Sequence, residues 1–327
     1  PAGDGLVSFR GIASTQNSSL IDGADDDQSF GGVPRGTGSE EDEGHRGAGL
    51  GRADGGGGYG RHSGMAYTFS QEAVREFRVS GQNYSALYGH AAGGIITTVS
   101  KSGTNAVHGS GFYLVRDSAL DAANPFSVAT HYVNGLVTSE VVKPHDLRQQ
   151  FGGSVGGPVV RDKVFYFYAY DQQRRGFPAV SSPVDPAFYS LTATQRALLG
   201  NRGVKATQVN VALNYLDSLT GIVARRADQT VNFGKVDWKM SENNRVSLQY
   251  DRARSSAPGG VRSAPVVGRG VASLGSSFVK VDSLLGRWMW TATPALSNEV
   301  RAQYGRDFQF EQAQRPLPQE PSVGLGG

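Results

Sequence analysis

Seven segments within residues 106–327 have side chains arranged as in a β-strand that separates water from an apolar phase. The clearest is 299–311, where polar and apolar side chains alternate and only Arg306 breaks the pattern. Because successive side chains of a strand point to opposite faces, one face suits water and the other suits lipid. The polar positions are Glu299, Arg301, Gln303, Asp307 and Gln309, and the apolar positions are Val300, Ala302, Tyr304, Phe308 and Phe310. The seven predicted strands are Val107–Asp117, Leu147–Gly157, Val164–Arg174, Thr230–Met240, Arg245–Arg254, Phe278–Thr291 and Glu299–Gln309.

The connections between these predicted strands alternate strictly between short and long. The short ones are Gly157–Lys163, Ser241–Asn244 and Ala292–Asn298, and the long ones are Ser118–Asp146, Arg175–Gln229 and Ser255–Ser277. Outer-membrane barrels alternate in this way because one rim carries tight periplasmic turns and the other carries long external loops. Most of the segments also have about the length that a tilted strand needs to cross a bilayer. The pattern therefore favours a membrane barrel over a soluble sandwich.

Two further features of these strands agree with a barrel. Trp238, Trp288 and Trp290 all lie close to short connections, as in the aromatic girdle at a membrane interface, although each could instead be a core aromatic of a soluble protein. Within 231–240, Val236, Trp238 and Met240 share one side, and Lys235, Asp237 and Lys239 share the other. The aromatic rings of 165–170 can lie over neighbouring glycines at 152, 153, 156 and 157 if the two segments pair.

Four short strands are predicted in the first 105 residues, at Leu6–Gly11, Ser19–Ala24, Val74–Ser80 and Ile95–Ser100. The second contains an Asp-Gly turn signal. These strands indicate a small mixed α/β or β domain. Residues 31–64 are rich in glycine and carry the acidic run Glu40–Glu43, a composition that indicates a flexible loop.

Several motifs in this order resemble those of TonB-dependent outer-membrane receptors. They are Phe9-Arg10-Gly11, Ile21-Asp22-Gly23, Ser85-Ala86-Leu87-Tyr88-Gly89, Gly93-Gly94-Ile95-Ile96 and the hairpin-like stretch Leu147–Tyr170. The sequence around them is most similar to that of the Oar-like branch, whose members often carry a carboxypeptidase-regulatory-like domain. The resemblance covers roughly residues 5–30 and 65–310. It implies a mainly β chain: a plug portion at 1–105, then at 106–327 about seven antiparallel strands of a barrel that uses about 22. We therefore expect the chain to be an internal fragment of a longer exported protein.

The resemblance also implies a function and partners. We expect a receptor of the Gram-negative outer membrane that binds a ligand outside and takes it up when the TonB complex remodels the plug. The TonB contact box lies before the plug and is not in this chain, and the ligand could be a siderophore, a glycan, a cobalamin-like molecule or a peptide. Arg10, Glu76 and Arg78 are candidates for an ionic latch between plug and wall. Candidates for ligand contact on the long loops are Phe126, Tyr132, Phe177 and Tyr189.

Two other classes of protein stay open on the sequence. One is an outer-membrane adhesin or a secretion-linked surface protein of the same fold. The other is a soluble extracellular β-rich binding protein, which would fold without detergent.

Composition narrows the remaining possibilities. The 327 residues carry a net charge of +3, which gives no electrostatic reason to expect a nucleic-acid partner. The chain has no cysteine, and no stretch approaches the roughly 18 consecutive apolar residues of a transmembrane helix.

An enzyme is the least supported class. Gly152–Gly156 matches G-x-S-x-G around Ser154, but a nucleophile elbow needs a helix after the turn and an aromatic strand follows instead. The six histidines are scattered without a zinc-binding spacing. We therefore expect no catalytic, cofactor or metal site.

Overall fold

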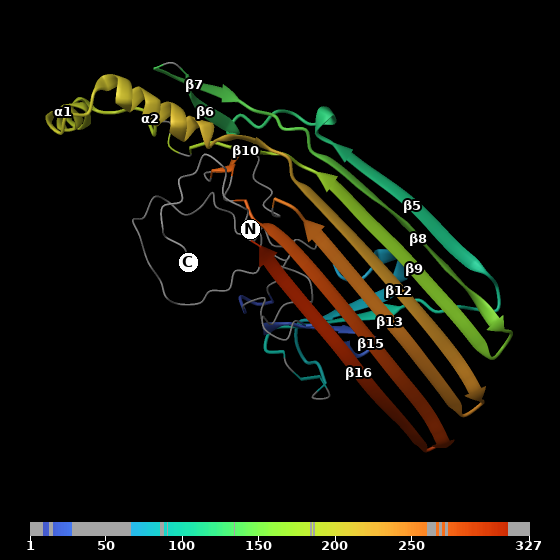
Figure 1. Cartoon of the computed structure of the whole chain (residues 1–327). Coiled ribbons are helices and arrows are strands. Elements are labelled where there is room, and N and C mark those ends of the chain that lie inside the picture. Colours follow the sequence, from blue (N-terminus) through green and yellow to red (C-terminus); the bar gives the residue numbers. More distant parts are fainter. Residues whose placement is uncertain are drawn as a thin grey trace.

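A seven-stranded antiparallel sheet dominates the computed structural model of the chain (Figure 1). The structure describes residues 9–12, 16–27, 67–85, 88–89, 91–133, 135–183, 185, 187–259, 266–267, 270–271 and 274–312. The strand order is β16-β15-β13-β12-β9-β8-β5, so strands that follow one another along the chain within this sheet are also neighbours in it. The strands are β5 (His108–Asp117), β8 (Leu147–Val160), β9 (Val164–Gly176), β12 (Arg226–Ser241), β13 (Asn244–Ala257), β15 (Ser276–Thr293) and β16 (Leu296–Gln312).

All seven predicted strands are confirmed, and so is the alternation of their connections. The turns at 161–163, 242–243 and 294–295 lie at one end of the sheet, and the long connections lie at the other (Figure 1). Within the described residues β5 and β16 pair with no further strand of this sheet, so the barrel is not closed.

The face of the sheet turned away from the N-terminal domain is exposed and carries many apolar side chains. Trp238 is 46% exposed, and Val236, Met240, Trp288 and Tyr304 on the same face are exposed too. The cross-strand register places Trp238, Val246, Trp288 and Val300 in one row, and all four point outward. So large an apolar surface is costly in water and stable in lipid, which is what the period-two pattern predicted.

Glycines of β8 make room for the aromatic rings of β9. Gly156 pairs with Phe167, and a Cβ atom at Gly156 would lie 3.0 Å from a ring carbon of that phenylalanine. Gly157 pairs with Tyr166, where the corresponding distance is 3.4 Å. The predicted stacking of rings over glycines is therefore confirmed at these two pairs.

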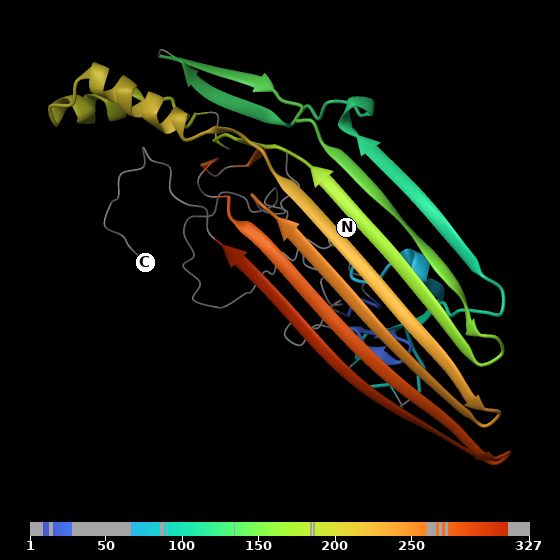
Figure 2. The same ribbon diagram turned by 45° about the vertical axis from the view of Figure 1, so that its right-hand side comes forward.

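The N-terminal domain is a four-stranded mixed sheet, here called the plug sheet, that lies on one face of the large sheet (Figures 1 and 2). Its order is β2-β1-β4-β3, and β1 runs parallel to β4. The elements are β1 (Ser18–Ile21), β2 (Ala24–Asp25), the 3-10 helix η3 (Gln71–Ala73), β3 (Val74–Ser80) and β4 (Ile95–Ser100). Asp22 and Gly23 join β1 to β2 with φ of +50° and +79°, so the predicted Asp-Gly turn is present as a tight hairpin turn.

The prediction of a strand at Leu6–Gly11 is wrong for its described part. Residues 9–12 form a tight turn in which Arg10 and Gly11 both have positive φ and the Ile12 amide donates to the Phe9 carbonyl. An Arg-Gly pair therefore serves as the turn itself. The predicted flexible loop at 31–64 lies outside the described residues.

The long connections contain structure of their own at the loop end of the sheet (Figure 1). They carry the 3-10 helix η4 (Ser118–Leu120) and a hairpin of β6 (Val128–Val133) and β7 (Leu136–Val141). They also carry the helices α1 (Ala193–Asn201) and α2 (Ala206–Ser218) and a small sheet of β10 (Ala179–Ser181), β11 (Gly221–Val223) and β14 (Val266–Val267). A capping box of Thr192 and Gln195 fixes the start of α1.

No helix in the described part of the chain has the length and apolar character to span a membrane.

Candidate functional site

Two aromatic side chains from the segment before η3 pack the plug against the inner face of the large sheet. Phe69 lies edge-on to Phe233 with ring centroids 4.9 Å apart, beside buried Phe167 and Ala169. Tyr67 packs on a second buried cluster, which consists of Val231, Ala253, Val279 and Val281. The inner face is therefore dry under these two rings, and the polar contacts around them are shielded from water.

A buried ion pair joins the plug to the wall at Lys235. The Lys235 Nζ lies 3.3 Å from Asp22 Oδ2, and the two side chains are 5% and 6% exposed. The Ser100 hydroxyl accepts from Lys235 at 2.8 Å and donates to Asp22 Oδ2 at 2.5 Å. The Ser100 amide donates to Asp22 Oδ1 at 3.0 Å. We call these three residues the Lys235 latch: Lys235 comes from β12 of the wall, and Asp22 and Ser100 come from the plug.

The geometry of the latch follows from the local fold. Asp22 occupies a positive-φ position in the β1–β2 turn, where aspartate is tolerated better than a branched side chain. Ser100 ends β4, the parallel neighbour of β1, so the two side chains meet at the same end of the plug sheet. Lys235 is on the inward side of β12 because it is two residues from buried Phe233. A buried charge needs a partner, so the three groups hold one another in place.

A second polar contact is centred on Asp171 of β9, which is fully buried. The Tyr67 hydroxyl donates to Asp171 Oδ1 at 2.5 Å, and Gln150 donates to that hydroxyl at 2.7 Å. The Ser70 hydroxyl donates to the other carboxylate oxygen at 3.5 Å. Burial, and next the hydrogen bond to Asp171, raise the pKa of Tyr67 above its usual range, so the phenol stays protonated and donates. Among the described residues, the carboxylate of Asp171 thus accepts hydrogen bonds from two plug hydroxyls and from Gln150 of the wall.

Further contacts tie the plug to the two edges of the wall. At β16, the Gln303 amide donates to the Asp25 carbonyl at 2.6 Å and accepts from the Asp25 amide at 3.1 Å. At β5, the Ser110 hydroxyl donates to Glu72 of η3 and lies 2.8 Å from the Ser154 hydroxyl. Ser154 therefore lies in the middle of β8, where its hydroxyl contacts the hydroxyl of Ser110 on the neighbouring strand.

The three predicted latch residues do not make these contacts. Arg10, Glu76 and Arg78 are exposed, and within the described residues the structure gives none of them an ion pair. Glu76 and Arg78 lie on β3, the edge strand of the plug sheet, whose Phe77 is 70% exposed. The contact residues found are Asp22, Lys235 and Asp171. Alternation had put Lys235 on the polar side of its strand, and Asp22 was part of a recognised motif, but no signal in the sequence paired them.

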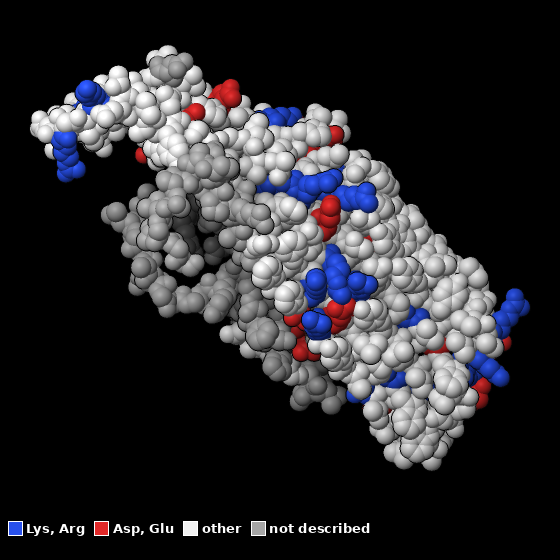
Figure 3. Space-filling view, viewed as in Figure 1, with Lys and Arg blue, Asp and Glu red and all other residues white. Residues whose placement is uncertain are grey.

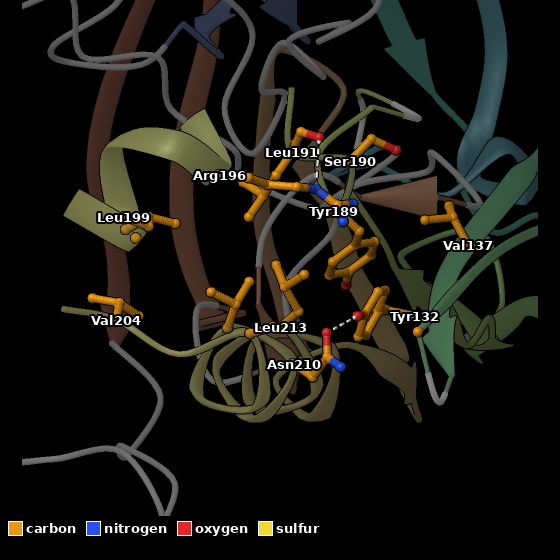
Figure 4. Close-up of a pocket in the computed structure, with 14 residues that line it drawn as sticks. Tyr132, Val137, Tyr189, Ser190, Leu191, Arg196, Leu199, Val204, Asn210 and Leu213 are labelled. Atoms are coloured by element: carbon orange, nitrogen blue, oxygen red, sulfur yellow. Dashed lines mark hydrogen bonds between the residues drawn. The ribbon is translucent and has the colours of Figure 1, made fainter. Parts of the chain in front are cut away.

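The loop end of the sheet holds a cavity of about 630 Å³ between α1, α2 and the β6–β7 hairpin (Figure 4). Tyr132 and Tyr189 line it with ring centroids 5.8 Å apart and pack in one cluster with Leu213, and Leu199 lines it as well. The Tyr132 hydroxyl donates to Asn210 Oδ1 at 2.9 Å. Burial, and next the charge of Asp217, raise the pKa of Tyr189 to about 12, so this phenol is neutral at physiological pH.

The four predicted ligand-contact residues have different surroundings. The structure places Tyr132 and Tyr189 in the cavity together. Phe177 is buried between Arg175 and Arg225, whose guanidinium carbons lie 4.4 and 4.5 Å from its ring centroid, which is a packing position. Phe126 is 90% exposed and outside the cavity. The described residues contain no group of three or more side chains suited to hold a metal ion.

Comparisons with known proteins agree with this architecture. Residues 99–197 match the family described as "Outer membrane beta barrel domain". No curated protein matches the chain in sequence. Among solved structures, the siderophore receptor PirA from Acinetobacter baumannii is similar with a TM-score of 0.50 and 12% identity, over 92% of this chain and 33% of that one.

A second solved structure is a mutant of the ferric enterobactin receptor PfeA from Pseudomonas aeruginosa in complex with enterobactin. It has a TM-score of 0.47 and 12% identity, over 92% of this chain and 34% of that one. The chain thus spans about a third of the length of the receptors that it matches. The family match indicates an outer-membrane β-barrel domain and so places the chain in the outer membrane, and the likeness to the solved structure of PirA shows a similar fold.

Proposed function

We propose that this chain belongs to a TonB-dependent receptor of the outer membrane that binds a ligand at its external loops and takes it up. Residues 1–105 would be a plug portion and residues 106–327 part of the barrel wall, within a longer protein that supplies the remaining strands. The motifs Arg10-Gly11 and Ile21-Asp22-Gly23 support the receptor family, and the sequences of 70–77, 83–89 and 101–105 support the Oar-like branch. The incomplete sheet supports the proposal that further strands exist.

The observation that carries the proposal is the polar interface between plug and wall. The Lys235 latch and the Asp171 contact are charged or hydrogen-bonded groups, and among the described residues Tyr67 and Phe69 supply the apolar packing beside them. Such an interface is stable only while every group keeps its partner, so a modest displacement of the plug opens it to water and the groups become solvated. A plug held in this way can be displaced and can return, as uptake through the barrel requires.

The external cavity is the proposed ligand site. Its tyrosines and leucines offer apolar and aromatic contact, and Asn210 and Arg196 offer polar groups at its edge. A volume of about 630 Å³ is suited to a small ligand or to one end of a glycan or peptide. The energy for uptake would come from the TonB complex.

Cross-linking the plug to the wall tests the proposed uptake. Glu72 and Ser110 are in contact across the interface, and these 327 residues contain no cysteine, so Glu72→Cys with Ser110→Cys introduces the two thiols of this part of the protein. A short cleavable thiol cross-linker in the full-length protein should abolish proton-gradient-dependent accumulation from a panel of ferric siderophores, oligosaccharides, cobalamin and peptides. Binding at the cell surface should persist, and cleavage of the linker should restore accumulation.

Each single-cysteine variant treated with the same reagent is the control, and it should accumulate ligand normally. Uptake that continues through a fully cross-linked plug would refute the transport proposal. Surface binding without any energised accumulation would favour the adhesin or secretion-linked alternative instead.

A further inference from the structure

We propose that the outward face of β13, β15 and β16 carries a binding site for the phosphate groups of an anionic lipid in the outer leaflet. Four basic side chains, Arg252, Arg254, Lys280 and Arg306, form this outer basic cluster. All four occupy outward positions, because they alternate with buried inward residues such as Ala253 and Val281. The inference concerns the lipid-facing surface and does not depend on uptake.

The cross-strand register brings the four cations into two adjacent rows. Arg252 pairs with Asp282, which pairs with Arg306, and in the next row Arg254 pairs with Lys280. Directly opposed side chains of antiparallel strands are only about 5 Å apart, so the charges reinforce one another. Figure 3 views the outward face and shows Lys and Arg side chains gathered over this part of β13 and β15.

One acidic residue is within the cluster, and it is already satisfied. Asp282 accepts two hydrogen bonds of 2.7 Å from Arg254 and one of 2.6 Å from the Tyr250 hydroxyl. Arg254 also donates to the carbonyl groups of Ala253 and Val281. Arg254 and Asp282 are therefore held in place by their mutual hydrogen bonds. Arg252, Lys280 and Arg306 are exposed, and the described residues offer them no ion pair. These three cations are available to an anion outside the protein.

The height of the cluster above the tryptophan girdle fits the thickness of a membrane. On β15, Lys280 is eight residues from Trp288 and ten from Trp290, and all three point outward. At ~3.4 Å per residue this is ~27–34 Å along the strand. With a tilt of ~40° the separation along the membrane normal is ~21–26 Å, against an apolar band of ~25 Å in such barrels. Lys280 and Arg254 therefore lie at the opposite interface from the tryptophans, beneath the external loops. Arg252 and Arg306, two residues nearer the girdle, lie ~5 Å deeper, a depth from which long basic side chains extend to the lipid headgroups.

The neighbours of the cluster are typical of a lipid interface. Between it and the girdle the outward side chains are uncharged, including Leu248, Leu284 and Tyr304. Above Arg306, Phe308 and Phe310 stack with ring centroids 6.4 Å apart, and Lys280 Nζ lies 6.0 Å from the Phe308 ring centroid. Guanidinium groups bind phosphate oxygens with paired hydrogen bonds, and the rings can pack on the adjoining acyl chains. Charge and position together favour a phosphorylated headgroup over a neutral one.

Lipid binding by the full-length protein in nanodiscs tests the proposal. The variant Arg252→Gln with Lys280→Gln and Arg306→Gln removes the three available charges and keeps Arg254 and Asp282. The matched control, Lys143→Gln with Arg202→Gln and Lys205→Gln, removes three exposed charges from the external loops, which lie beyond the apolar band. The probe is lipid A, a bis-phosphorylated glycolipid, compared with its dephosphorylated form in a phosphatidylcholine background.

We expect wild type and control to bind lipid A alike, and the cluster variant to bind it about 100-fold more weakly, because each cation near an anionic surface contributes about five-fold. The dephosphorylated lipid should bind weakly to all three proteins. Equal binding of lipid A by wild type and the cluster variant, with both barrels folded by circular dichroism, would overturn the proposal. Equally tight binding of the dephosphorylated lipid would overturn it too, as would displacement of lipid A by millimolar inorganic phosphate, since that result would indicate a site for free anions.

Discussion

Replacing Lys235 with methionine should loosen the plug without disturbing the barrel wall. Methionine keeps the length and much of the volume of the lysine side chain but removes the charge, so Asp22 stays buried beside Ser100 without its cation. Removing one partner from a buried ion pair costs about 3–5 kcal/mol, because the remaining charge is uncompensated. Both side chains of this pair are almost fully buried, so solvent screening does not reduce the figure.

Hydrogen exchange of the plug amides measures this cost directly. The Ser100 amide donates to Asp22, and the amides of β4 pair with β1 and β3, so their exchange reports opening of the plug sheet. A loss of about 3 kcal/mol corresponds to roughly 100-fold faster exchange where opening limits the rate. Amides of β5 and β8, which do not pair with β12, should exchange as in wild type.

Lys239→Met is the matched control for that experiment. Lys239 is four residues further along the same strand and pairs with Glu242, which is 85% exposed. An exposed pair of this kind contributes little to stability, because water screens it. Plug exchange in Lys239→Met should therefore stay within a few-fold of wild type. If Lys235→Met exchanged no faster than Lys239→Met, the latch would not hold the plug.

Three other predictions concern the plug contact, the plug–barrel junction and the external cavity. Tyr67→Phe should destabilise the plug by about 1–3 kcal/mol, because buried Asp171 loses a hydrogen-bond donor. Wild-type plug stability should fall above about pH 10, because Tyr67 ionises there in the unfolded state but not in the folded state, where its pKa is raised, and Tyr67→Phe should remove this contribution to the fall. Urea unfolding at a series of pH values measures both effects. Gly103→Ala should cost at least about 1–3 kcal/mol, since its Cβ would lie 2.2 Å from a backbone carbonyl oxygen, whereas Gly234→Ala, with no atom within 4 Å, should be tolerated in the same thermal melts. Leu199→Trp should fill the cavity and lower ligand affinity at least ten-fold in a surface-binding assay, with plug exchange unchanged; unaltered affinity would show that the ligand binds elsewhere.

The wall of the barrel could be predicted from the sequence because its signal is local. Each strand repeats a period of two, and the turn at 242–243 or 294–295 needs only its own residues to form. The outward position of Trp238 and the inward position of Lys235 follow from the same alternation. The Asp22–Gly23 turn was predictable for a similar reason, since two positive-φ positions favour that dipeptide.

The contacts between plug and wall could not be predicted in this way. Alternation assigns Lys235 to a face, but many inward residues share that face, and Asp22 is more than two hundred residues away in the chain. The latch predicted at Arg10, Glu76 and Arg78 followed from a resemblance in motif order, which does not specify how the plug sheet is oriented on the wall. Helices α1 and α2 were missed because their sequences lack a strong apolar face and lie within a connection that the barrel pattern leaves unspecified.

The central claim is that 299–310 separates a lipid-facing set of side chains from one that faces the plug. A nitroxide scan of single cysteines along this strand, in the full-length protein in bilayers, tests it most directly. We expect oxygen accessibility to peak at Val300, Ala302, Tyr304 and Phe308 and to fall at Arg301, Gln303 and Asp307, with a period of two. Uniform accessibility along the strand, or maxima at the polar positions, would contradict the account.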